Sequence, residues 1–137
     1  MKNLIAVFLI LFLFGCKEKL ELVHTNPFDD NYVGEPYIFL DSVEQLTSYT
    51  LDGQGDTTFS IDLKAFAHTT YACENCKCAF YWNGFRQYPK DASFTNNSAF
   101  QFLYNFHKGD IVTLQAALSN NVDVYSKKSE VLTYTVK

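Results

Sequence analysis

Three cysteines and one histidine form the group of residues with the clearest potential for chemistry. Cys73, Cys76 and Cys78 lie within six residues, and His68 stands five residues before the first of them. Three thiolates and one imidazole are an established tetrahedral ligand set for structural zinc. In an oxidising compartment two of the thiols would instead form a disulfide, and a third alternative keeps all three cysteines reduced. The spacing by itself leaves these three alternatives open.

A second group surrounds the dipeptide Asn83-Gly84, the strongest two-residue β-hairpin signal in the chain. Tyr81, Phe85, Arg86 and Tyr88 flank this turn. Aromatic rings at the edge of a sheet stack on sugars or anchor protein partners, and arginine adds a planar hydrogen-bond donor. We therefore treat these four residues as a candidate binding surface. The alternative, in a chain this rich in aromatic residues, is that most of them belong to the core.

The sequence offers no catalytic set. Its three histidines, His24, His68 and His107, are scattered along the chain. It contains no Gly-x-Ser-x-Gly elbow, no phosphate-binding loop and no His-x-x-x-His pair. We assign no catalytic residue and expect neither enzymatic activity nor a cofactor.

Most of the chain from residue 36 onward alternates between apolar and polar residues, which is the period of a β-strand. This pattern predicts about seven short strands and an all-β, antiparallel two-sheet sandwich. One row is expected to face the core: Phe59, Ile61, Leu63, Ala65 and Ala67. The strands are expected at residues 37–46, 58–67, 78–82, 85–88, 99–106, 111–118 and 131–136.

One strand carries a row of four aromatic residues at every second position, namely Phe100, Phe102, Tyr104 and Phe106. Residues two apart share one face of a strand, so these four rings should lie side by side. Because four aromatic side chains carry a large apolar area, we expect this row to be buried between the sheets.

The composition narrows the class of protein. The chain has 137 residues, of which 17% are aromatic, and a formal net charge of −4 at pH 7. The aromatic content is far above that of a disordered chain. An acidic balance without a stripe of lysine and arginine argues against nucleic acid as a partner. The length fits one domain, so a multidomain enzyme and a polytopic membrane protein are excluded as well.

The chain begins with a predicted targeting segment. Lys2 supplies a positive charge, and residues 4–14 are an unbroken run of eleven apolar residues. A helix of that length spans roughly 16 Å, about half of a bilayer core, and has the size of the apolar region of a signal peptide. Residues 1–15 are therefore predicted to be a removable signal peptide.

The end of this run, Leu13-Phe14-Gly15-Cys16, resembles the lipobox of bacterial lipoproteins. In that family the cysteine is acylated and becomes the mature N-terminus. The resemblance implies a lipid on Cys16, the lipid bilayer as a partner, and the outer membrane of a Bacteroidota-type envelope as the location. Acyl chains contribute about 0.8 kcal/mol per buried methylene, so three of them would anchor the protein essentially permanently. Both faces of that membrane, periplasmic and surface-exposed, are compatible with the sequence.

Residues 16–33 are predicted to be the lipidated N-terminus and a flexible tether, because they are polar and show no sustained period. The segment Asn26-Pro27-Phe28-Asp29-Asp30 resembles a linker common after the tether of Bacteroidota lipoproteins. Asp29, Asp30 and Asn31 could contact calcium. We favour a turn built from Asx side chains, because these residues hydrogen-bond their own backbone.

Residues 34–137 resemble a fibronectin type III or immunoglobulin-like domain. The run Phe106-His107-Lys108-Gly109-Asp110-Ile111-Val112 follows that family's corner between two strands, with Val112 in the place of the corner tyrosine. Tyr81-Trp82-Asn83-Gly84 resembles the third strand and the turn after it. The resemblance implies the fold and says nothing about chemistry.

The resemblance also bears on the cysteines. Cys78 shares a face with Phe80 and Trp82, which the family likeness makes the buried face. We therefore favour a Cys73–Cys76 disulfide and treat Cys78 as a small core residue. The zinc site described above is the alternative.

These expectations describe a membrane-anchored lipoprotein of the cell envelope that acts as a non-enzymatic binding or adaptor module. Its expected partner is another envelope or outer-membrane protein, and a glycan is a further ligand class. Two alternatives are a structural subunit of an outer-membrane complex and a metal or redox protein that uses Cys73, Cys76 and Cys78.

Overall fold

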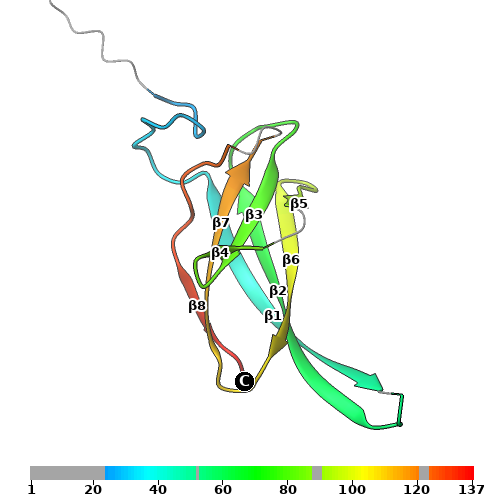
Figure 1. Ribbon diagram of the computed structural model, residues 1–137. Helices are drawn as coiled ribbons and strands as arrows, with labels where there is room; N and C mark the ends of the chain where they lie inside the picture. The colour runs from blue at the N-terminus through cyan, green and yellow to red at the C-terminus, as the bar shows by residue number, and fades with distance from the viewer. Residues whose placement is uncertain (1–23, 52, 88–90, 121–123) are drawn as a thin grey trace, which may run out of the picture.

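The computed structural model describes residues 24–51, 53–87, 91–120 and 124–137 (Figure 1). The predicted signal peptide, Cys16 and Tyr88 lie outside these residues. The described chain contains strands and turns but no helix, and hence no helix long and apolar enough to cross a membrane.

The described residues form eight strands in two antiparallel sheets. They are β1 (Ile38–Leu51), β2 (Thr57–Thr69), β3 (Lys77–Trp82), β4 (Phe85–Arg86), β5 (Ala92–Ser93), β6 (Ser98–Phe106), β7 (Ile111–Ser119) and β8 (Leu132–Thr135). The first sheet has the order β1-β2-β6, and the second has the order β4-β3-β7-β8, with β5 also paired to β3. The predicted all-β, antiparallel two-sheet sandwich is confirmed, with the two-residue β5 as an addition to the expected strands.

The core lies between the two sheets. Leu63, Ala65 and Ala67 of β2 are fully buried, as the alternation predicts, and they share one apolar cluster with Phe80 of β3 and Leu114 of β7. Burying one such large side chain stabilises the fold by roughly 1.5–3 kcal/mol. The small alanines of β2 allow the facing sheet to approach closely.

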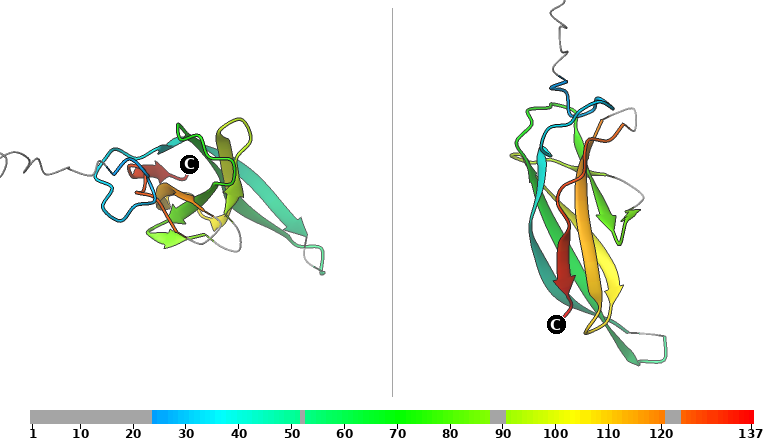
Figure 2. Two further views of the ribbon diagram at one scale, coloured as in Figure 1. Left: turned by 90° about the horizontal axis from the view of Figure 1, so that it is seen from above. Right: turned by 90° about the vertical axis from the view of Figure 1, so that its left-hand side faces the viewer.

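The hairpin formed by β1 and β2 extends beyond the other strands, at the end of the molecule opposite the first described residues (Figure 2). β2 pairs with β6 only as far as Ile61, whereas β1 and β2 continue to pair up to Leu51 and Thr57. Tyr49 and Phe59 are cross-strand neighbours in this extension, and each exposes 71% of its surface. The expectation that Phe59 faces the core is therefore wrong, because its part of β2 extends past the end of the second sheet.

The predicted burial of the aromatic row on β6 is wrong for three of its four members. Phe106 is buried, whereas Phe100 and Tyr104 expose 49% and 55% of their surface and Phe102 is half-buried. These three rings lie on the outer face of the first sheet.

A local irregularity explains the split within this row. Asn105 has a φ of 67°, and the pairing of β2 with β6 shifts register between Ile61 and Leu63. A one-residue shift exchanges the two faces of a strand, so Phe106 turns inward after three aromatic residues that point outward. The inward positions before the shift belong to Ala99 and Leu103, which expose 2% and 1% of their surface.

Two turns match their sequence signals. Asn83 and Gly84 have φ angles of 48° and 84°, as a two-residue type I′ hairpin requires. At the corner between β6 and β7, Gly109 has a φ of 93° and donates a 2.8 Å hydrogen bond to the carbonyl of Val136. Val112, three residues later, is buried.

Part of the segment predicted to be a tether lies against the domain. The Asx turn is present, because the Asp29 carboxylate accepts a 2.9 Å hydrogen bond from the backbone N–H of Asn31. Pro27 is buried, and the ring of Phe28 packs edge-on against Tyr71 with 6.3 Å between their centroids. The described chain is therefore attached to the sandwich before residue 34.

Candidate functional site

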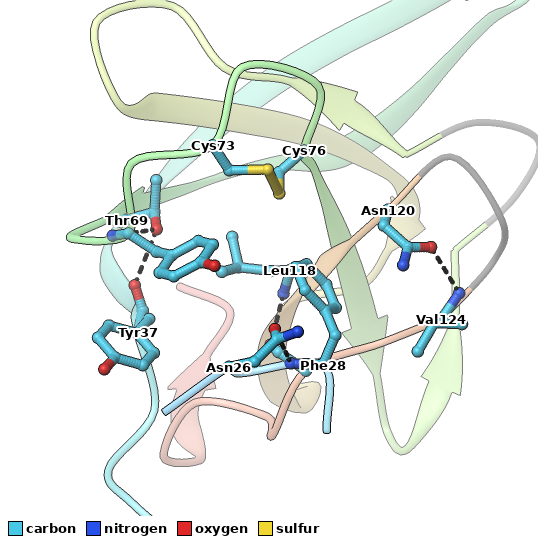
Figure 3. The surroundings of a disulfide bond; sticks show 11 residues. Asn26, Phe28, Tyr37, Thr69, Cys73, Cys76, Leu118, Asn120 and Val124 are labelled. Atoms are coloured by element: carbon cyan, nitrogen blue, oxygen red, sulfur yellow. Dashed lines mark hydrogen bonds between the residues drawn. A yellow bond between two sulfur atoms is a disulfide. The ribbon is translucent and has the colours of Figure 1, made fainter. Parts of the chain in front are cut away.

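The cysteine loop before β3 contains a disulfide. Cys73 and Cys76 are bonded, with 5.5 Å between their Cα atoms (Figure 3). The chain that leads into this loop is fixed by the Thr69 hydroxyl, which donates a 2.9 Å hydrogen bond to the carbonyl of Tyr37. The favoured Cys73–Cys76 bridge is thus confirmed.

The proposed zinc ligands are not assembled in the described chain. Cys73 and Cys76 are consumed by the disulfide, and Cys78 is fully buried on β3. His68 lies on β2 in the other sheet, where its ring hydrogen-bonds to Asp41. Among the residues that the structure describes, no three histidine, cysteine or acidic side chains gather at one point.

Cys78 is a core residue with no access to solvent. Burial, reinforced by the nearby carboxylate of Asp91, raises the pKa of the Cys78 thiol far above its ordinary value. A thiol held in its neutral form is a poor nucleophile and a poor metal ligand, because both roles need the thiolate. Cys78 is therefore a packing residue of the core, as the sequence predicted.

Of the four residues predicted to form a binding surface around the Asn83-Gly84 turn, the three that the structure describes do not form one exposed surface. Phe85 exposes 77% of its surface, but Tyr81 exposes only 9% and packs with Ala79 and Ala117 on the outer face of the second sheet. The Lys128 ammonium lies 3.9 Å from the centroid of the Tyr81 ring and covers it. The prediction that Tyr81 lines an open surface is therefore wrong, and Tyr88 lies outside the described residues.

Arg86 is engaged in a structural network. Its guanidinium donates two hydrogen bonds to one oxygen of Asp91, from Nη2 at 2.8 Å and from Nε at 3.1 Å. The other Asp91 oxygen accepts a 2.5 Å hydrogen bond from the Ser119 hydroxyl. The guanidinium carbon also lies 4.7 Å from the centroid of the Tyr125 ring. Asp91, just before β5, is thereby bound to Arg86 of β4 and to Ser119 of β7.

A contiguous row of partly exposed aromatic residues lies on the first sheet, and three of them, Phe100, Phe102 and Tyr104, were predicted to be buried. We name it the Lys64 face and define it by five residues of β2 and β6: Lys64, Phe66, Phe100, Phe102 and Tyr104. Their positions follow from the register, in which Lys64 pairs with Phe102 and Phe66 pairs with Phe100. Neighbouring rings are in contact, with centroid separations of 6.1, 5.7 and 6.3 Å along the row from Phe66 to Tyr104.

Lys64 provides the positive charge of this face. Its ammonium lies 4.4 Å from the ring centroid of Phe100, 4.7 Å from that of Phe66 and 5.7 Å from that of Phe102. Within the described part of the chain, no carboxylate oxygen lies within 4.0 Å of this ammonium. Glu44 of β1 is the cross-strand neighbour of Lys64, but the ammonium lies over the rings of β2 and β6 instead of pairing with that carboxylate. In this position it is able to pair with an acidic group of a ligand.

A groove adjoins the Lys64 face at its β6 side. It has a volume of about 350 Å³, and its walls come from residues 91–93 on one side and from Phe100, Gln101, Phe102 and Tyr104 on the other. Contiguous exposed apolar surface with a polar border is typical of interaction sites. The Lys64 face with its groove is therefore our candidate interaction site.

The sequence pattern identified the aromatic row of β6 but assigned Phe100, Phe102 and Tyr104 to the wrong side of the sheet. A signal was present in the alanines: Ala65, Ala67 and Ala99 are small residues whose positions alternate with larger ones, among them Phe66 and Phe100. Small residues are common where two sheets approach closely, so a strand with alanine on one face and aromatics on the other can bury either face. Only the facing sheet decides which one is buried.

No protein-family model, no curated protein and no solved structure matches this chain.

Proposed function

We propose that the protein is a membrane-anchored lipoprotein of the cell envelope that acts as a non-enzymatic binding module. In this proposal Cys16 carries the lipid, the outer membrane is the location, and the Lys64 face holds a partner protein of the envelope. The single observation that carries the binding role is the exposure of Phe100 and Tyr104 on the outer face of the first sheet.

The size of that surface supports the binding role. An aromatic side chain buries 150–250 Å² when it is covered, so the rings of one sheet face represent a large unsatisfied apolar area. Single exposed apolar residues are ordinary on a soluble domain, whereas a contiguous row in ring-to-ring contact is characteristic of a site that a partner covers.

The anchor is supported by the sequence alone, through the run Leu13-Phe14-Gly15-Cys16 at the end of an apolar segment. The position of the described N-terminal end is compatible with it. Residues from His24 onward lie at one end of the sandwich, and the hairpin of β1 and β2 projects from the other end (Figure 2). A chain anchored through Cys16 would present both faces of the sandwich to neighbouring proteins.

The strand order supports the proposed resemblance to fibronectin type III and immunoglobulin-like domains. In domains of that kind two antiparallel sheets pack face to face, and successive strands cross between them. Here the chain passes from the first sheet to the second after β2, returns for β6 and crosses again to β7. Such folds host many unrelated functions, so this likeness adds nothing about the ligand.

A structural subunit of an envelope complex is the second candidate function, and the same aromatic face favours it. The two candidates differ in whether the protein is stable alone. A binding module should be monomeric and soluble once its lipid is removed, whereas a subunit that needs its complex should aggregate through the Lys64 face.

The anchor is tested by replacing Cys16 with serine and separating the cell into membrane and soluble fractions. The substitution is expected to move the protein into the soluble fraction. Retention of the variant in the membrane fraction would reject the lipoprotein assignment.

The binding role is tested by capturing partners from solubilised outer membrane with the wild-type protein and with a Phe100→Ser, Tyr104→Ser double variant. A stoichiometric partner should be captured by the wild type and lost with the double variant. Phe85→Ser is the matched control, because Phe85 is exposed but belongs to the second sheet. Equal capture by all three proteins would contradict a role of the Lys64 face.

A further inference from the structure

The outer strands of the two sheets differ in how well they are protected from pairing with another chain. Proteins protect exposed edges with short strands, charged side chains, prolines or bulges. β8 has four residues, and β4 and β5 have two each. β1 is long, but it contains Asp41 and Glu44, shifts register after Leu40, and is held at Gln45 by hydrogen bonds to the backbone of Lys137.

β6 lacks these protections over most of its length. Its nine residues include no charged residue and no proline, and its irregularity lies near the end, at Asn105. Among the strands of the described chain, β6 pairs with β2 alone. A long, uncharged edge strand is a template for strand addition.

The hydrogen-bond pattern shows which backbone groups of β6 reach the free edge. In an antiparallel pair, residues that exchange hydrogen bonds alternate with residues that do not. The N–H of Thr69 donates to the carbonyl of Asn97 at 2.9 Å, so the hydrogen-bonded positions in this register are odd-numbered. The backbone groups of the even-numbered residues therefore point away from β2. In agreement, the Phe102 carbonyl accepts a 3.3 Å hydrogen bond from the side-chain amide of Gln101.

The space beside this edge suits an extended chain. The groove of about 350 Å³ lies between β6 and residues 91–93 and is lined on the β6 side by Phe100, Gln101, Phe102 and Tyr104. Of these, Phe100 and Phe102 direct their backbone groups to the edge. A strand placed there would form main-chain hydrogen bonds with Phe102. Its alternate side chains would contact the outward rings of Phe100 and Tyr104.

The charge at this edge indicates the chemistry of the incoming segment. Lys64 lies one strand away from the edge, but its ammonium leans over β6, 4.4 Å from the centroid of the Phe100 ring. An acidic side chain on the outer face of an added strand would meet this ammonium above the rings. A basic side chain at the same position would be repelled.

We propose that β6 accepts an extended polypeptide segment of another protein as an additional strand, with apolar alternate residues against the rings and an acidic residue paired with Lys64. This inference rests on the proposed binding role and specifies its mode and its partner chemistry. A second copy of the chain fits less well. A second copy would bring its own β2 and residues 91–93 alongside its β6, whereas a single extended segment brings no flanking strand to the edge.

The test uses the full-length protein, purified in detergent, and displayed random peptides of nine residues, the length of β6. Peptides that bind are selected, identified by sequencing and then synthesised. We expect them to alternate apolar residues and to contain aspartate or glutamate, and to slow amide hydrogen exchange at Phe100 and Phe102. Lys64→Gln should weaken the acidic peptides by about two- to fivefold, as for an exposed ion pair.

A pair of variants separates main-chain pairing from ring contact. Phe102→Ala and Phe102→Pro both remove the ring, but only proline removes the N–H that points to the edge. The proline variant should bind the peptides about tenfold more weakly than the alanine variant. If near-ultraviolet circular dichroism shows that the proline variant is unfolded, main-chain pairing is judged instead from the exchange footprint of the peptide on the wild-type protein.

Four results would overturn the proposal: no peptide is enriched, the two Phe102 variants bind equally, the footprint lies away from β6, or the protein forms dimers that Phe102→Pro abolishes. The last result would assign β6 to a second copy. Capture of an envelope partner that depends on Phe100 and Tyr104 but not on the Phe102 N–H would reject strand addition and leave the proposed function standing. If peptides protect β6 from exchange but no envelope partner is captured, the proposed function is rejected and strand addition to β6 stands.

Discussion

Arg86 and Asp91 form a two-point contact in which Nη2 and Nε of the guanidinium both donate to a single carboxylate oxygen, at 2.8 and 3.1 Å. The side chains expose 20% and 6% of their surface, so the pair is largely shielded from water. A buried carboxylate is stable only while its charge is compensated, and here the Ser119 hydroxyl completes that compensation at the second oxygen. Together the two contacts bind Asp91 to β4 and to β7, and Asp91 belongs to one wall of the groove beside β6.

The first prediction concerns this pair. Arg86→Met should lower the free energy of unfolding by about 2–3 kcal/mol, because it leaves the Asp91 carboxylate buried without its cation. Arg86→Lys keeps the charge and should cost less. Urea denaturation measures both changes. Equal losses in the two variants would contradict the argument from buried charge, and no loss in either would show that the pair does not support the fold.

The second prediction concerns the disulfide. Cys73 and Cys76 are three positions apart, so the bridge closes a very short loop and should contribute at most about 2 kcal/mol. A Cys73→Ser, Cys76→Ser double variant should therefore remain folded with a modestly lower melting temperature. The denatured, unreduced wild-type protein should show one free thiol, Cys78, when Cys16 is blocked by lipid. Three free thiols would contradict the bridge.

The third prediction concerns the pH dependence that Cys78 causes. Burial raises the pKa of its thiol in the folded protein above the ordinary value of 9.0. Above that pH the unfolded chain releases the thiol proton and the folded chain keeps it, so stability should fall as pH rises, by up to about 1.4 kcal/mol per pH unit. Cys78→Ala is the control, since it retains every lysine and tyrosine that also titrates at high pH. Parallel curves for the wild type and Cys78→Ala, measured by urea denaturation between neutral and alkaline pH, would contradict this contribution.

The fourth prediction separates the two faces of β6. Tyr104→Ser should change the free energy of unfolding by less than about 1 kcal/mol, because the ring is more than half exposed. Leu103→Ala, one residue earlier and fully buried, should cost about 2–5 kcal/mol. Thermal or urea denaturation of both variants checks the pair. A larger loss of unfolding free energy for Tyr104→Ser than for Leu103→Ala would mean that the buried and exposed faces of β6 are the reverse of those described.

Local patterns in the sequence determined most of the secondary structure. The alternation around Leu63 and Leu114 predicted strands, since neighbouring residues on a strand point to opposite faces whatever the rest of the chain does. Asn83-Gly84 predicted its hairpin because both residues tolerate positive φ. The Cys73–Cys76 bridge, favoured because the family likeness placed Cys78 in the core, lies as expected within one short loop.

Only the tertiary structure decided which face of each strand is buried. Phe100 and Ala99 lie on opposite faces of β6, and the strand buries the alanine because β2 and the opposite sheet leave space for a small residue there. Tyr81 is covered by Tyr125 and Lys128, which are distant in sequence. The two residues of β5 form a strand because they pair with Lys77 and Cys78, not because of their own pattern. The period of a sequence shows which side chains share a face of a strand. Which face is buried depends on the side-chain volumes of the strands that pack against it, and those strands are distant in the sequence.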